Sequence, residues 1–185
     1  MTTAVLDANV LFPAPLRDYL LHLAELKLFL PKWTDEIHEE WITNLLAKRR
    51  DLKRQSLESA RKAMNEAFPD SNIVRFKGVM ESLHLPDAKD RHVLAAAIKS
   101  DADVIVTFNT RDFPVPYLKT FGISRQHPDD FVSHLIVAHG AKTLEALENH
   151  SRRLRNPPKS KQDVLEALKR CGLPKSAAFL QSRLT

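Results

Sequence analysis

The sequence has few of the residues that build cofactor and metal-cluster sites. It contains one cysteine, Cys171, and four glycines among its 185 residues. One cysteine excludes an internal disulfide and any multi-cysteine zinc or iron–sulfur site. No phosphate-binding Walker motif is present, and the eight histidines show no metal-ligand spacing. A zinc-protease motif also fails, because Ile42 stands where the second histidine after His38-Glu39 is required.

Long apolar runs are missing as well. No stretch approaches the roughly 20 apolar residues of a membrane span. The first residues, MTTAVLDANVLF, have neither a basic region nor a sustained apolar run, so they do not resemble a signal peptide. A single cysteine also fits a reducing compartment. We therefore expect a soluble cytoplasmic protein without membrane contact.

Charge is unevenly distributed along the chain. Residues 1–139 carry 18 Lys/Arg and 19 Asp/Glu, whereas residues 140–185 carry 10 and 4. A basic segment attracts phosphate backbones, although a solvated helical surface would have the same composition. The length of the chain predicts one domain, or one domain with an appendage.

The hydrophobic pattern predicts an α/β region followed by an all-helical one. Strands are expected at 4–6, 29–31 and 103–107, helices at 16–28, 34–49, 51–68 and 88–100, and a loop at 108–116. Further helices are expected at 129–139, 141–153, 161–171 and 174–183. The predicted division is residues 1–126 for the α/β domain and 127–185 for a helical extension.

Polar side chains follow two of the predicted strands. Asp7 and Asn9 come after the first strand, and Thr107, Asn109 and Asp112 end or follow the third. Ligands of open α/β sheets bind at the carboxyl ends of the strands. If these strands are parallel neighbours, the five side chains meet at one edge of the sheet.

Two predicted helices carry further acids. On the 34–49 helix, a rotation of about 100° per residue turns Glu39 to solvent and leaves Glu40 or Glu36 beside the buried stripe. On the next, Asp87 fits a helix cap, while Asp90 in the first turn can point towards the sheet edge. Carboxylates gathered in one pocket repel each other unless a cation binds among them, and oxygen ligands select Mg²⁺ or Mn²⁺.

Four segments together resemble the PIN-domain family of nucleases. They are Ala4-Val-Leu-Asp7-Ala-Asn9, Trp33-Thr-Asp-Glu-Ile-His-Glu-Glu40-Trp, Leu85-Pro-Asp-Ala-Lys-Asp90-Arg and Thr107-Phe-Asn109-Thr-Arg-Asp112-Phe. Their order and spacing, over roughly residues 2–126, are most similar to toxins of the VapC kind that have a helical C-terminal extension.

The resemblance implies a three-layer α/β/α fold with a central parallel sheet and an Mg²⁺- or Mn²⁺-dependent endoribonuclease. It assigns Asp7 and Asp90 as central metal ligands, and Glu40 as a ligand of the metal or its water. Asp112 would complete the site with support from Asn109, although the division between these two residues stays open. It also implies an RNA substrate, an antitoxin that fills the active site, and often a homodimer.

Structural roles compete with some of these assignments. Thr107 either orients a water or only ends a strand, Asn9 is expected to brace the loop after the first strand, and Asp87 to cap a helix. Arg91 and Arg111 either grip phosphate or pair with neighbouring carboxylates. Two other functions remain: a nuclease of the same fold acting on DNA or structured RNA, and a catalytically silent PIN fold that binds nucleic acid or protein.

Overall fold

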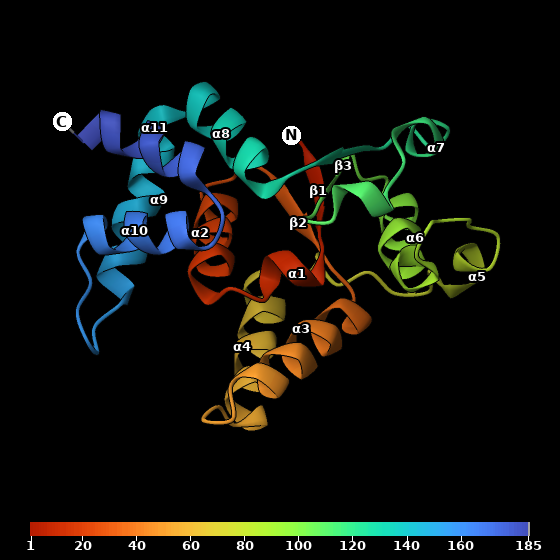
Figure 1. Ribbon diagram of the computed structural model, residues 1–185, viewed down its shortest axis with the longest axis horizontal. Helices are drawn as coiled ribbons and strands as arrows, with labels where there is room; N and C mark the ends of the chain where they lie inside the picture. The colour runs from red at the N-terminus through yellow and green to blue at the C-terminus, as the bar shows by residue number, and fades with distance from the viewer. Residues whose placement is uncertain (185) are drawn as a thin grey trace. The chain divides into compact units, whose positions relative to one another are not determined.

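The computed structural model describes residues 1–184, which form two compact units (Figure 1). We call one the α/β unit; it consists of Thr2–Phe12 and Leu30–Gln126. The other, which we call the helical unit, consists of Met1, Pro13–Phe29 and the described residues from His127 onward.

The α/β unit is built on a four-stranded parallel sheet. Its strands are β1 (Thr3–Leu6), β2 (Leu30–Lys32), β3 (Val104–Val106) and β4 (Ser124–Gln126), in the order β2-β1-β3-β4. In the register of the sheet Val5 lies opposite Ile105 on one side and Lys32 on the other. The two central strands are apolar and almost fully buried, as parallel strands covered by helices must be. The predicted α/β class with a central parallel sheet is confirmed.

Helices surround this sheet within the α/β unit. They are α1 (Ala8–Leu11), α3 (Asp35–Lys48), α4 (Arg54–Ala67), α5 (Lys77–Met80), α6 (Arg91–Lys99) and α7 (Val115–Lys119), with 3₁₀ turns η1 (Ala88–Asp90) and η2 (Thr110–Asp112). Helix α3 begins where the Thr34 hydroxyl accepts a hydrogen bond from the Ile37 amide at 3.1 Å. Its stripe of Ile37 and Trp41 is fully buried. Helix α6 packs its buried residues Val93–Ala97 on β1 and β3.

The helical unit contains the predicted all-helical C-terminal region. Its elements are α2 (Ala14–Glu25), α8 (Pro128–Ala138), α9 (Gly140–Arg153), α10 (Lys161–Arg170) and α11 (Pro174–Leu184). One buried carboxylate, Asp129, joins α8 to the start of α11. It accepts from the amides of Lys175 and Ser176 at 3.0 and 2.8 Å and from the Ser176 hydroxyl at 2.6 Å. The first-turn amides of α11 are thereby satisfied by a side chain 46 residues away.

Several predicted boundaries were wrong. The helix predicted at 16–28 ends at Glu25, because Lys27 adopts a left-handed φ of 58°. The second strand is Leu30–Lys32, and Pro31 lies inside it because β2 is an edge strand that does not need that amide. The predicted loop 108–116 contains η2 and the start of α7.

Other elements were not predicted at all. Helices α1, α5 and α7 have only four or five residues, too short for a hydrophobic period. Strand β4 reads Ser-Arg-Gln and lies at the other edge of the sheet, so it carries no apolar pattern.

The two compact units also differ from a simple division of the chain at residue 126. Residues Pro13–Phe29 belong to the helical unit, although they lie within the predicted first domain. The division into domains 1–126 and 127–185 remains a prediction. Among the described residues, no helix is long and apolar enough to cross a membrane.

Candidate active site

A cleft of about 430 Å³ opens at the carboxyl ends of β1 and β3. It is lined by residues of the α/β unit that come from widely separated parts of the chain: Asp7, Ala8, Asn9, Phe12, Glu40, Asn44, Ala47, Lys48, Asp90 and Asn109. Of the predicted site residues, Asp7, Asn9, Glu40, Asp90 and Asn109 therefore share one cavity. Parallel pairing of β1 and β3 creates this arrangement by bringing both strand ends to the same edge.

Asp7 is the most firmly held of these acids. Its carboxylate is 4% exposed and accepts hydrogen bonds from the Ala8 amide at 2.7 Å, the Asn9 amide group at 2.7 Å and the Thr107 hydroxyl at 2.6 Å. Burial raises its pKa, the hydrogen bond from Thr107 opposes that rise, and the charge of Glu40 adds to it. Three hydrogen bonds to this buried carboxylate hold it in one orientation.

Asn9 and Thr107 connect the two strand ends. Asn9 donates to Thr107 Oγ1 at 3.1 Å and accepts from the Phe108 amide at 3.1 Å, so it braces the loop after β3. The Thr107 hydroxyl also accepts from the Asn109 amide at 3.0 Å. Both side chains thus position Asp7 and the β3 loop together.

The three glutamates of α3 have different surroundings. Glu40 lines the cleft and lies 3.4 Å from His92 Nε2. Glu36 does not line it and pairs with Lys77 at 3.3 Å. Glu39 accepts from Arg54 of α4 at 2.7 Å and from Thr43, one turn further along α3, at 3.0 Å. These hydrogen bonds lower the pKa of Glu39 to about 2.

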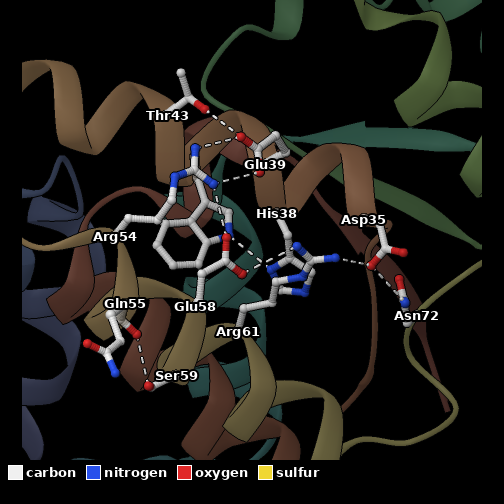
Figure 2. Close-up of polar contacts among 11 residues, drawn as sticks. Asp35, His38, Glu39, Thr43, Arg54, Gln55, Glu58, Ser59, Arg61 and Asn72 are labelled. Carbon is white, nitrogen blue, oxygen red and sulfur yellow. Dashed lines mark hydrogen bonds and ion pairs between the residues drawn. The ribbon is translucent and has the colours of Figure 1, made fainter.

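Figure 2 shows the polar network that holds the outer face of α3 on α4. Arg54 joins Glu39 to Glu58, and Arg61 pairs with Asp35 at 2.7 Å and with Glu58 at 3.5 Å. Asp35 also accepts from Asn72 at 3.1 Å. Exposed ion pairs are individually weak, so the network mainly fixes the rotation of α3. With Glu39 on this outer face, Glu40 faces the cleft.

Asp87 and Asp90 differ in a similar way. Asp87 accepts from the Lys89 amide at 2.8 Å, which is a capping bond. Asp90 makes no capping bond to α6, and its carboxylate lines the cleft. The geometry separates a structural acid from one that is available to a ligand.

The segment that follows β3 contains Asn109 and Asp112. Asn109 lines the cleft, whereas Asp112, in η2, does not. Asp112 still acts on the site through its charge, which raises the pKa of Asp90.

Negative charge accumulates in this cleft, where Lys48 is the only Lys or Arg among the described lining residues and His92, when protonated, lies beside Glu40. Burial raises the pKa of Asp90 to about 7, and the charges of Asp7, Asp112, Asp87 and Glu40 add to the rise. Within residues 1–184, no Lys or Arg forms an ion pair with Asp7, Asp90 or Asp112. The predicted alternative that Arg91 or Arg111 neutralises these carboxylates is therefore wrong. A bound cation would relieve the repulsion among these carboxylates.

The donor set suits a hard divalent ion. The groups facing the cleft include carboxylate and amide oxygens, the ligands preferred by Mg²⁺ and Mn²⁺. No three His, Cys, Asp or Glu side chains in the described part of the chain have the spacing of a preformed metal site. The case for a metal therefore depends on the type of donor atoms and on their accumulated negative charge.

Four cleft neighbours were not singled out from the sequence as site residues. His92 is the partner of Glu40, while Phe12, Asn44 and Lys48 line the cleft. The Lys48 ammonium lies 5.1 Å from the centre of the Phe12 ring, within cation–π range. The i, i+4 spacing of Glu40, Asn44 and Lys48 on α3 was the available signal.

The fold and cleft define an α/β protein with acids gathered at the carboxyl edge of a parallel sheet. The family model described as PIN domain matches residues 3–111, more than half of the chain, and the chain belongs to that family. A second model, described as VapC50 C-terminal domain, matches residues 128–182.

One curated relative is similar to part of the chain. It is named "Putative ribonuclease VapC50" and comes from Mycobacterium tuberculosis (strain ATCC 25618 / H37Rv). The two are 39% identical over 80 residues, which cover 43% of this chain and 47% of the relative's length. The chain thus matches about half of the curated protein. No solved structure matches it.

Proposed function

We propose that this protein is a metal-dependent endoribonuclease whose active site is the acidic cleft of the α/β unit. The observation that carries the proposal is the gathering of Asp7, Glu40 and Asp112 around Asp90, whose pKa is raised to about 7 by burial and further by the charges of these acids. Membership of the PIN-domain family and the name of the mycobacterial relative support ribonuclease chemistry in particular.

Each acid would have a distinct task. Asp7 would supply a fixed oxygen ligand, because Thr107, Asn9 and the Ala8 amide hold its carboxylate in one direction. Asp90 would supply the second ligand from the opposite wall, and Glu40 and Asp112 would bind through water or directly. When bound, Mg²⁺ or Mn²⁺ would neutralise the phosphate, activate a water and stabilise the leaving oxygen.

The remainder of the cleft would hold the RNA strand. Lys48 is exposed, and its ammonium can contact a backbone phosphate. Phe12 offers an aromatic ring on which a base can stack. Asn44, which also lines the cleft, can donate to and accept from a base edge. These three side chains would place the scissile phosphate beside the acids.

The family resemblance also supports a partner and a setting. An antitoxin protein that covers the acidic cleft would keep such a ribonuclease inactive, and cellular RNA as substrate would require a cytoplasmic location. Co-expression with the protein encoded next to this chain, followed by purification of the complex, tests the partner. The homodimer stays a prediction, and sedimentation equilibrium of the purified chain would test it.

The deciding experiment is cleavage of single-stranded RNA and single-stranded DNA with Mg²⁺ or Mn²⁺. We expect RNA cutting that stops with EDTA and falls at least ~10³-fold in Asp90→Asn. Asp70→Asn is the matched control, because that side chain is exposed and does not line the cleft. Cutting of DNA alone would favour another substrate for the same site, and cutting that survives EDTA and Asp90→Asn would contradict the proposal.

A further inference from the structure

A second cavity, of about 700 Å³, lies within the helical unit and, within residues 1–184, shares no lining residue with the acidic cleft. It lies between the start of α2, the end of α9 and α10, and the loop 154–160 forms part of its wall. Its volume falls in the range of about 300–1,000 Å³ that is typical of small-molecule sites. The proposed ribonuclease activity does not use it.

Three positive side chains at this cavity form no close ion pair. Arg155, Lys159 and Arg170 line it, and none of them forms an ion pair within residues 1–184. Arg153 lines it too, but is paired with Glu25 at 3.1 Å. Three cations around one cavity attract an anionic group.

The acids of the same cavity are mostly engaged elsewhere. Asp163 accepts from the Ser160 amide and hydroxyl at 2.8 Å in a capping box, and Asp18 lies 3.4 Å from Arg17. Glu166 is the one lining acid that forms no hydrogen bond or ion pair in the described part of the chain. The hydrogen bonds from Ser160 lower the pKa of Asp163, and the nearby charges of Lys159 and Arg170 lower it further. The cavity nevertheless has more positive than negative side chains, because Arg153, Arg155, Lys159 and Arg170 line it with Asp18, Asp163 and Glu166.

The loop that carries two of the cations is held in place. The Ser151 hydroxyl donates to the Lys159 carbonyl at 2.6 Å, and the Lys159 amide donates to the Leu154 carbonyl at 3.3 Å. Arg155 and Pro158 form a β-bridge within the loop. Since the backbone at both ends is bonded, less ordering is needed when a ligand arrives.

Apolar side chains form another part of the wall. Pro15, Leu154 and Val164 line the cavity beside the cations. Inorganic phosphate would not contact this apolar surface and would fill only a small part of the cavity volume of about 700 Å³. A nucleoside phosphate would use both parts, since its base can lie on the apolar wall while its phosphate meets the guanidinium groups.

We propose that this cavity of the helical unit binds a nucleoside phosphate, either as a free nucleotide or as one nucleotide of an RNA strand. Arg155, Lys159 and Arg170 contact the phosphate, and the apolar wall contacts the base. If the ligand is part of an RNA strand, the site would add affinity for the substrate. If the ligand is a free nucleotide, substrate binding would respond to that nucleotide.

The test is made on the full chain in EDTA, so that binding is measured without cleavage. One probe is a fluorescein-labelled single-stranded RNA of about 12 nucleotides, followed by anisotropy, and the other is adenosine 5′-monophosphate, followed by calorimetry. The variant Arg155→Gln/Arg170→Gln is compared with Arg152→Gln/Lys169→Gln. The control pair removes the same charge from neighbouring positions that do not line the cavity.

We expect the cavity variant to bind at least one probe ~10-fold more weakly, and the control less than 2-fold. For RNA, the slope of log affinity against log salt should fall by about 0.7 for each phosphate that the variant no longer binds. Binding of the mononucleotide would identify a free nucleotide as a source, and binding of RNA alone would identify the strand.

Three results would overturn the inference. They are no binding of either probe, unchanged binding of both probes in the cavity variant, or equal losses in both double variants. None of these bears on the ribonuclease proposal, which is judged separately by metal-dependent cutting and Asp90→Asn.

Discussion

Two buried or half-buried aspartates in this protein have opposite surroundings, and the contrast distinguishes the two units. Asp129 in the helical unit accepts from two amides and a hydroxyl, so its charge is fully used in holding α11. Asp90 in the α/β unit caps nothing and lies among other acids, which helps to raise its pKa to about 7. One carboxylate stabilises the fold, and the other is held in place despite destabilising it.

This difference indicates which of the two units contains the ligand site. A destabilising charge cluster that is also concave and rich in oxygen donors is typical of a ligand site. In the helical unit, hydrogen bonds satisfy Asp129 and Asp163, and burial lowers the pKa of His22 and His150. Part of its positive charge lies around a cavity. Each of the following predictions tests one side of this comparison.

The largest effect is expected from Glu40→Gln compared with Glu39→Gln. Glu40 lines the cleft, whereas Glu39 on the same helix is occupied by Arg54 and Thr43. We expect RNA cleavage to fall ~10²-fold in Glu40→Gln and less than 2-fold in Glu39→Gln. Initial rates at saturating Mn²⁺ give the comparison. Equal losses would mean that α3 acts only as a scaffold.

Removal of the satisfied acid should weaken the helical unit. Asp129→Ala leaves the amides of Lys175 and Ser176 in the first turn of α11 without their acceptor, whereas the Ser176 hydroxyl keeps the backbone carbonyl of residue 129. The expected loss of unfolding free energy is about 2–3 kcal/mol. Urea denaturation followed by far-ultraviolet circular dichroism measures it, with exposed Asp130→Ala as control. A loss below about 0.5 kcal/mol would show that the cap is unimportant.

Acid should destabilise the helical unit through its buried histidines. Burial lowers the pKa of His150 to about 4 and also lowers the pKa of His22. The unfolded chain therefore binds more protons than the folded chain between pH 6.5 and about 4, and stability is lost as pH falls through that window. We expect a loss of about 2 kcal/mol.

His150→Phe provides the control for this pH effect. A phenyl ring preserves the ring contacts with Tyr19 and His22 but cannot be protonated. Hydrogen exchange of α2 and α9 amides at pH 6.5 and 4.5 compares this variant with the unmodified protein. The same pH dependence in both proteins would rule out His150 as the cause.

A smaller effect is expected at the RNA-binding end of the cleft. Lys48→Gln removes one charge beside Phe12 without touching the acids. We expect KM for RNA to rise ~3–10-fold with kcat nearly unchanged, and the salt slope of binding to fall by about 0.7. Lys53→Gln, an exposed lysine that does not line the cleft, is the control. A fall in kcat alone would contradict a role in binding.

Much of the α/β unit could be predicted because its information is local. Ala4-Val5-Leu6 and Val104-Ile105-Val106 are apolar and buried, so the central strands were recognisable, and the acids follow them directly. The helical turn angle separated Glu39 from Glu40. Strand β4 was missed because Ser124, Arg125 and Gln126 form an edge strand without an apolar face.

Non-local features could not be predicted. The bonds from Asp129 to the start of α11 span 46 and 47 residues, and nothing in either segment specifies the other. The grouping of Pro13–Phe29 with the later helices depends on packing that no short pattern records. The site roles of Asp7, Glu40, Asp90 and Asp112 stay predictions until a variant of each is measured.

The most direct test of the central claim is the stability of Asp90→Asn with and without Mn²⁺. Both tryptophans, Trp33 and Trp41, lie in the α/β unit, so their fluorescence follows that unit during urea unfolding. In EDTA at pH 7.5 we expect the variant to be more stable by about 1–2 kcal/mol, after allowance for solvent screening of a half-buried group. Saturating Mn²⁺ should stabilise the unmodified protein and leave the variant nearly unchanged, which narrows or reverses the difference. A variant that is less stable in EDTA, or equal stabilisation of both by Mn²⁺, would contradict the account.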